Sequence, residues 1–130
     1  MGMYDFLVVN GPNLGFLGER QPEIYGSEGM DALPGMVGAL LGDGAADVGL
    51  EVFQGNGEGQ IIDRLEQARA DGVHGLVLNA GAYTHTSLAL ADCLAWIKIP
   101  CGEVHLSNVL ARGERLRQKR YIGRNANGLV

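Results

Sequence analysis

The chain has 130 residues, of which 46% are hydrophobic and 19% are charged, and its formal net charge is -5. This length suits one domain with a real core, over residues 1–130, and the composition excludes an intrinsically disordered protein. The acidic balance argues against binding to the phosphate backbone of nucleic acids. Neither an apolar run of membrane-spanning length nor a secretory leader is recognisable, so we expect a cytoplasmic protein without membrane contact.

The chain is expected to open with a strand over residues 6–9 and a helix over residues 27–46. The first apolar run stops at Asn10, Gly and Pro, as a buried strand does where it reaches the edge of a sheet. The second segment has apolar residues on one helical face, but it is interrupted by several glycines, each of which costs about 1 kcal/mol relative to alanine. We therefore expect a short helix that begins near Pro34, because proline suits a first helical turn.

Three further strands are predicted, and they alternate with two helices. These strands are the segments over residues 50–53, 75–78 and 103–106. The first of the helices covers residues 60–70, and the second covers residues 86–96 with Thr86 or Ser87 as its N-cap. This alternation predicts βαβ units and a single α/β domain with a parallel sheet. Cys93 and Cys101 have no CxxC spacing, and we expect buried, reduced thiols.

Polar side chains collect where three of the predicted strands end. They are Asn10 and Asn13, then Asn79 and His85, and finally Glu103, His105, Ser107 and Asn108. Because parallel strands end at the same edge of a sheet, we expect these groups to converge on one pocket. Two loop segments add arginines and a tyrosine, so the pocket is suited to anions and to proton transfer. The sequence has no nucleotide-binding fingerprint, and His85 and His105 lack the further ligands that a zinc site needs.

Five motifs, in order between about residues 6 and 121, resemble the type II 3-dehydroquinate dehydratases. They are Asn10-Gly-Pro-Asn-Leu14, Arg20-Gln-Pro-Glu-Ile-Tyr25-Gly26, Gln54-Gly-Asn56-Gly-Glu58-Gly59, Asn79-Ala-Gly-Ala-Tyr-Thr-His85-Thr-Ser87 and Glu103-Val-His105-Leu-Ser107-Asn108. The resemblance implies a flavodoxin-like three-layer sandwich and a hydro-lyase that converts 3-dehydroquinate to 3-dehydroshikimate. It further implies that the enzyme uses no metal or other cofactor and assembles as a homododecamer built from trimers.

The resemblance also implies catalytic roles. Tyr25 matches the base, which removes the proton alpha to the ketone as a tyrosinate, and the charge of Arg20 would favour that phenolate. Asn13 matches the group that holds a water or an oxygen against the developing enolate. His105 matches the general acid that protonates the departing hydroxyl, and Glu103 matches the carboxylate that orients it.

Seven residues match the family's substrate-binding groups. They are Asn79, His85, Asp92 (reaching in from a neighbouring subunit), Leu106 and Ser107 through their backbone amides, Arg112 and Arg117. Relative to the family, one extra residue lies between the last two arginines, so Arg115 is the alternative to Arg117.

The family pattern extends beyond Val130, the last residue of this sequence. Family members continue through a final strand and a closing helix, so we expect four clear strands here, with the fifth strand and the closing helix truncated. The sheet face that the first and last helices share should then be poorly covered. This departure leaves a second functional interpretation, a catalytically weak or silent relative kept as a binding or assembly protein. The sequence does not separate a biosynthetic role from a catabolic one.

Overall fold

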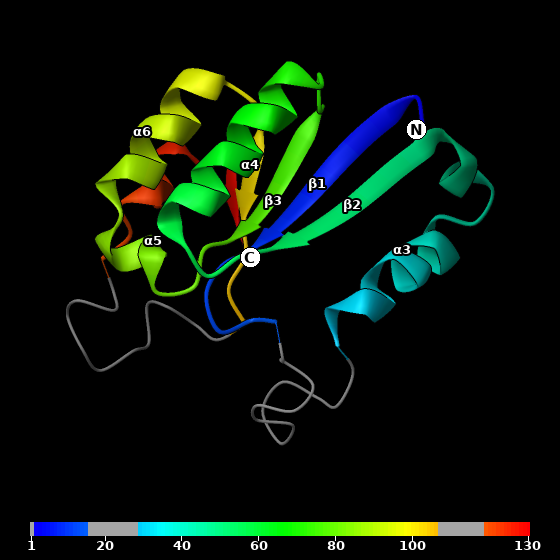
Figure 1. Ribbon diagram of the computed structural model, residues 1–130. Coiled ribbons are helices and arrows are strands. Elements are labelled where there is room, and N and C mark those ends of the chain that lie inside the picture. Colours follow the sequence, from blue (N-terminus) through cyan, green and yellow to red (C-terminus); the bar gives the residue numbers. More distant parts are fainter. Residues whose placement is uncertain (1, 16–28, 107–118) are drawn as a thin grey trace.

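In the described part of the chain, five parallel strands form one sheet in the order β2-β1-β3-β4-β5 (Figure 1). This computed structural model describes residues 2–15, 29–106 and 119–130. The strands are β1 (Tyr4–Asn10), β2 (Val48–Gln54), β3 (Gly75–Asn79), β4 (Cys101–Glu103) and β5 (Gly128–Leu129). With helices on both faces of the sheet, this is the flavodoxin-like α/β fold that the sequence predicts.

The helices divide between the two faces of the sheet (Figure 1). On one face lie α4 (Glu58–Ala70), α5 (Tyr83–Thr86), α6 (Leu88–Ile97) and the 3-10 turn η4 (Ile122–Asn125). The other face carries α3 (Leu33–Leu41), flanked by the 3-10 turns η1 (Met30–Ala32) and η2 (Gly42–Asp47). Within the described residues, no helix combines the length and the apolar character that crossing a membrane requires.

Successive residues of β1 face opposite sides of the sheet. Leu7 and Val9 belong to the core under α4 and α6, where Ile61, Leu65 and Ile97 are fully buried. Burying one such side chain contributes roughly 1.5–3 kcal/mol, so this face supplies most of the stability of the described fold. The sequence prediction of an apolar stripe on the helix over residues 60–70 is confirmed.

The α3 face is poorly covered, as the sequence analysis expects. None of the residues of α3 is buried, and a cavity of 510 Å³ separates this helix from the sheet. Apolar side chains line this cavity, among them Val8 of β1, Leu50 of β2 and Val77 of β3. Since α3 has only nine residues, it cannot close the space above three strands.

Most of the predicted elements change at their boundaries, and four of them show why. The helix expected over residues 27–46 is α3, where Pro34 lies in the first turn and Gly42, with φ +57°, ends the helix. The strand expected over residues 103–106 is β4, which ends earlier because its ladder with β3 stops at the Leu78–Glu103 pair. The helix expected over residues 86–96 is α6, which begins after Ser87. The fifth strand, expected to be truncated, is present as the two residues of β5.

Candidate functional site

Three amide side chains stand at the same level at the carboxyl ends of β1, β2 and β3. In the ladder register, Asn10 is the partner of both Gln54 and Asn79. Asn10 and Asn79 also line the cavity under α3. Among the described residues, nothing accepts a hydrogen bond from the buried Nδ2 of Asn10. The end of the cavity nearest this edge therefore carries polar amides, whereas the rest of it is apolar.

The loop after β1 is held by the residues that follow β2. The Nε2 of Gln54 donates to the carbonyl oxygen of Gly11 over 3.1 Å and to Oδ1 of Asn56 over 3.0 Å. The same Oδ1 accepts the backbone N–H of Asn13 over 3.2 Å. Asn13 has φ +68°, a left-handed conformation that asparagine tolerates better than most residues. The side chains of Gln54 and Asn56 thus hold the backbone of the loop after β1.

His85 lies on α5, directly after β3, and is buried. Its Nδ1 is 2.6 Å from the carbonyl oxygen of Lys119. Because a carbonyl oxygen only accepts hydrogen bonds, Nδ1 of His85 carries a hydrogen. The backbone N–H of Tyr121 donates to the carbonyl oxygen of Thr84 over 2.9 Å, so residues 119–121 are anchored along α5.

Glu103 is the last residue of β4, and its side chain has no exposed surface. One of its oxygens, Oε2, accepts a hydrogen bond from Nε2 of His105. Arg120 binds the same carboxylate through Nε, at 2.7 Å from Oε2, and Nη2, at 3.3 Å from Oε1. A buried carboxylate is costly unless it is paired, and Arg120 supplies the pairing charge. Arg120 is not among the residues predicted from the sequence; the signal that points to it is the buried glutamate, which needs a cation.

Of the predicted site residues that the structure describes, all except Asp92 lie at or just beyond the carboxyl ends of the strands. They are Asn13, Asn79, His85, Glu103, His105 and Leu106. Asp92 is exposed on α6. The remaining predicted residues lie outside the described residues, and they are Arg20, Tyr25, Ser107, Arg112 and Arg117, together with the alternative Arg115.

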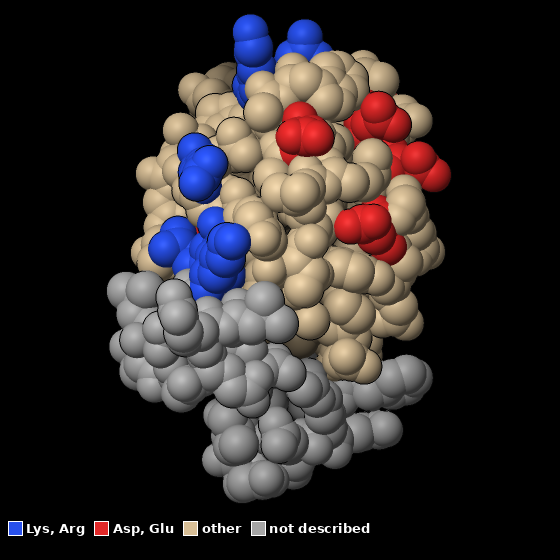
Figure 2. Space-filling model, turned by 90° about the vertical axis from the view of Figure 1, so that its left-hand side faces the viewer, with Lys and Arg blue, Asp and Glu red and all other residues tan. Residues whose placement is uncertain are grey.

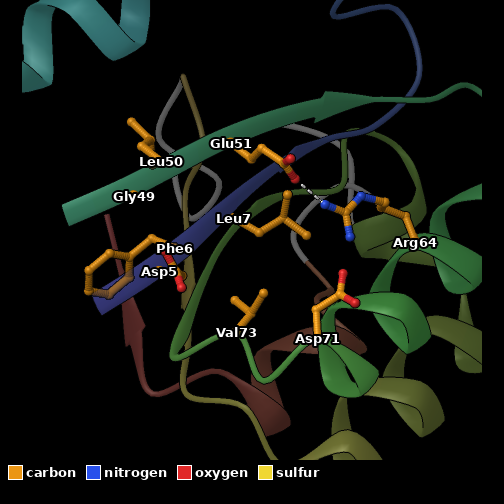
Figure 3. A pocket seen from close by; sticks show the side chains of 9 residues that line it. All are labelled: Asp5, Phe6, Leu7, Gly49, Leu50, Glu51, Arg64, Asp71 and Val73. Carbon is orange, nitrogen blue, oxygen red and sulfur yellow. Dashed lines mark hydrogen bonds and ion pairs between the residues drawn. The ribbon is translucent and has the colours of Figure 1, made fainter. Parts of the chain in front are cut away.

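A second cavity, of 340 Å³, lies beside the first halves of β1 and β2, away from their carboxyl ends (Figure 3). Arg64 of α4 forms an ion pair with Glu51 of β2 there. This cavity contains none of the predicted site residues. Within the part of the chain that the structure describes, no group of three or more His, Cys, Asp and Glu side chains is arranged to hold a metal ion.

Charge is unevenly distributed over the surface. On the face in Figure 2, Lys and Arg side chains gather along one side, and Asp and Glu side chains lie on the other. The guanidinium of Arg120 supplies positive charge beside Glu103, and Nζ of Lys119 lies 4.6 Å from the ring centroid of Tyr121. A chain with a net charge of -5 therefore still presents cations at the candidate site.

Comparison with known proteins identifies the family. The family model for dehydroquinase class II matches residues 4–130. The chain belongs to this family. A 3-dehydroquinate dehydratase from Polynucleobacter asymbioticus is 45% identical over 124 residues, which cover 95% of this chain and 81% of the relative. A protein from Botryotinia fuckeliana named catabolic 3-dehydroquinase is 41% identical over 100% of this chain and 84% of its own.

A solved structure shares the fold. The type II dehydroquinase from Butyrivibrio crossotus superposes with a TM-score of 0.86 at 41% identity, over 98% of this chain and 86% of that one. Family membership agrees with the parallel sheet and with the polar residues at its carboxyl edge.

Proposed function

We propose that this protein is a 3-dehydroquinate dehydratase of the type II class, which removes water from 3-dehydroquinate to give 3-dehydroshikimate. Family membership over residues 4–130 supports the reaction. The observation that carries the chemistry is the buried Glu103 carboxylate bonded to Nε2 of His105 at the carboxyl edge of the sheet. A histidine oriented by a carboxylate is a general acid–base device, and the reaction needs an acid for the departing hydroxyl.

The proposed reaction proceeds through an enolate. Tyr25, as a tyrosinate stabilised by Arg20, removes the proton alpha to the ketone. Asn13 holds a water or an oxygen against the charge that develops on the enolate. The hydroxyl then leaves with a proton from His105. Because Glu103 accepts the Nε2–H, the acid is His105 with both ring nitrogens protonated, and Nδ1 would give this proton to leave a neutral imidazole.

The remaining predicted residues would bind the substrate. Asn79, His85 and the backbone amides of Leu106 and Ser107 supply neutral hydrogen-bonding groups, and the arginines supply charge for the substrate carboxylate. These arginines are Arg112 and either Arg117 or Arg115. Asp92 would complete the site of a neighbouring subunit in a dodecamer of trimers, and its exposure on α6 suits this role. The free, buried cysteines fit a reducing compartment, and we propose the cytoplasm.

The appearance of the conjugated enone of 3-dehydroshikimate, followed by its ultraviolet absorbance, tests the proposed function. We expect turnover by the wild type and a loss of about 10²–10⁴-fold in kcat for Tyr25→Phe and for His105→Asn. The matched controls are Tyr121→Phe and His74→Asn, which alter residues without a proposed role. Tight binding of 3-dehydroquinate without turnover would contradict the proposal and favour the silent relative.

Analytical ultracentrifugation tests the proposed assembly. A dodecamer in the wild type, together with a raised KM in Asp92→Asn at unchanged assembly, is the expected result. A monomer with full activity would contradict the role of Asp92, because no neighbouring site would then exist for this residue to complete.

A further inference from the structure

We propose that Arg120 is a positioning residue that fixes the Glu103 carboxylate and, through it, the imidazole of His105. The inference rests on the proposed function, in which His105 is the general acid. Arg120 spans both carboxylate oxygens, at 2.7 Å from Oε2 and 3.3 Å from Oε1. His105 binds the oxygen that accepts the shorter of these two bonds. The side chains of Arg120 and His105 therefore bind the same carboxylate.

The charge of Arg120 determines which nitrogen of His105 carries the hydrogen. Glu103 has no exposed surface, so water cannot stabilise its charge, and the adjacent guanidinium supplies the opposite charge. An ionised carboxylate only accepts hydrogen bonds, and Nε2 of His105 must therefore donate. The other nitrogen, Nδ1, is then the one that exchanges a proton with substrate. Without the guanidinium, this hydrogen could instead be shared with the carboxylate, and the imidazole would lose its defined tautomer.

The backbone around Arg120 is anchored, which lets the guanidinium act as a fixed support. The next residue, Tyr121, donates its N–H to Thr84, and Ile122 is buried in the core. The N–H of Gly123 donates to the carbonyl oxygen of Arg120 over 3.3 Å. Three consecutive residues after Arg120 therefore restrain its position.

Because Gly123 has no side chain, the guanidinium of Arg120 can lie close to its Cα atom. A Cβ atom at this position would lie 2.7 Å from Nη2 and 3.0 Å from Cζ of Arg120. Such an approach is too close for non-bonded atoms, so any larger residue must displace the guanidinium. The displacement would disturb its bonds to Glu103 without altering Arg120 itself.

Two substitutions of Arg120 separate charge from geometry. Arg120→Gln keeps a hydrogen-bond donor but removes the charge, and we expect kcat for 3-dehydroquinate to fall about 10- to 100-fold with KM within about twofold. Arg120→Lys restores the charge but cannot span both oxygens, so an intermediate kcat is expected. The matched control is Arg124→Gln, since Arg124 is exposed on η4, and it should keep the wild-type kcat.

Gly123→Ala provides an independent test with Arg120 intact. We expect kcat to fall in the same direction as in Arg120→Gln, again with little change in KM. Gly44→Ala is the matched control, because a Cβ at position 44 would meet no atom within 4 Å. A normal kcat in Gly123→Ala, with the fold preserved by circular dichroism, would contradict the proposed support.

The position of the hydrogen on the His105 imidazole can be measured independently of enzyme activity. Long-range 1H–15N spectra resolve the three histidines of the chain and show which ring nitrogen carries the hydrogen. We expect Nε2 of His105 to carry a hydrogen in the wild type and in Arg120→Lys, whether or not Nδ1 is also protonated, and a changed pattern in Arg120→Gln. Absence of turnover in the wild type would overturn the proposed function. The proposed effect of Arg120 on the His105 imidazole would still be tested by these spectra. An unchanged pattern and kcat in Arg120→Gln would overturn the role of Arg120.

Discussion

The Nδ1 hydrogen of His85 is donated to the carbonyl oxygen of Lys119 over 2.6 Å, and this bond ties α5 to the segment before η4. The residue after Lys119 is Arg120, whose side chain holds Glu103 and thereby His105. Two consecutive residues therefore support two histidines that come from different strand ends. The positions of the two imidazoles are linked through this short segment, which contains neither of them.

Removing the hydrogen bond of His85 should weaken substrate binding more than turnover. In His85→Phe the ring volume stays, but the donor to Lys119 and the proposed contact with substrate are lost. We expect KM for 3-dehydroquinate to rise about tenfold and the free energy of unfolding to fall by about 1 kcal/mol, the usual contribution of one hydrogen bond. Steady-state kinetics and urea unfolding measure the two effects.

His74→Phe is the matched control for this prediction. His74 accepts the backbone N–H of Asp5 at the opposite end of β1, and its ring packs edge-on against Tyr4. Its replacement should leave KM unchanged. If both variants raise KM equally, the effect of His85→Phe is a general loss of structure and the binding role is wrong.

The sequence predicts those parts of the fold that depend on local pattern. The apolar run before Asn10 and the apolar stripe that includes Ile61 are correctly assigned, because each depends on the residues of its own segment. The end of β4 is not predicted correctly, since it depends on where the ladder with the neighbouring strand β3 stops. Five of the predicted site residues lie outside the described residues, so for them the sequence remains the only guide.

Arg120 illustrates what the motifs of a sequence leave out. It lies outside all five motifs and 17 residues from Glu103, so nothing in its local pattern marks it. The burial of Glu103 is a property of the folded sheet, so it is known only from the structure. A rule that every buried carboxylate needs a partner would have prompted the search for a cation, but only the topology identifies which one.

Helix α3 should exchange its amide hydrogens faster than α4. Exchange requires local opening, which costs little where few apolar contacts break. None of the residues of α3 is buried, whereas Ile61, Leu65 and Ala68 of α4 are. Hydrogen–deuterium exchange followed by mass spectrometry should therefore show early labelling of residues 33–41 and late labelling of residues 58–70. Equal protection would mean that the 510 Å³ cavity is filled in solution.

Both cysteines should be unreactive in the native protein. Burial raises the pKa of the Cys93 thiol from 9.0 to about 11, and the nearby Glu66 carboxylate adds to the shift. For Cys101, burial likewise raises the pKa to about 11, with a contribution from Glu103. At pH 8 only about one thiol in a thousand is then ionised, and the thiolate is the reactive form. Mass spectrometry should find neither thiol alkylated by iodoacetamide until guanidinium is added.

The same shifts predict a loss of stability in alkali. The unfolded thiols lose their protons near pH 9, whereas the folded ones keep theirs until about pH 11. The unfolded state therefore binds fewer protons in this window, and the free energy of unfolding falls as pH rises through it. Thermal unfolding between pH 8 and pH 11 measures the slope. Cys93→Ala should make the slope shallower, and an unchanged slope would show that other groups cause it.

Replacing Thr84 by valine should stabilise the protein. Thr84 is fully buried on α5, and among the described residues no group pairs with its Oγ1. A buried hydroxyl without a partner costs about 1–3 kcal/mol, and valine has nearly the same shape without the polar atom. We expect Thr84→Val to raise the free energy of unfolding by about 1 kcal/mol in urea titration. Thr86→Val, at an exposed position of the same helix, should stay within about 0.5 kcal/mol of the wild type. A clear destabilisation by Thr84→Val would mean that the hydroxyl is hydrogen-bonded in solution, and the neighbouring His85 would then lie in a more polar environment than the structure indicates.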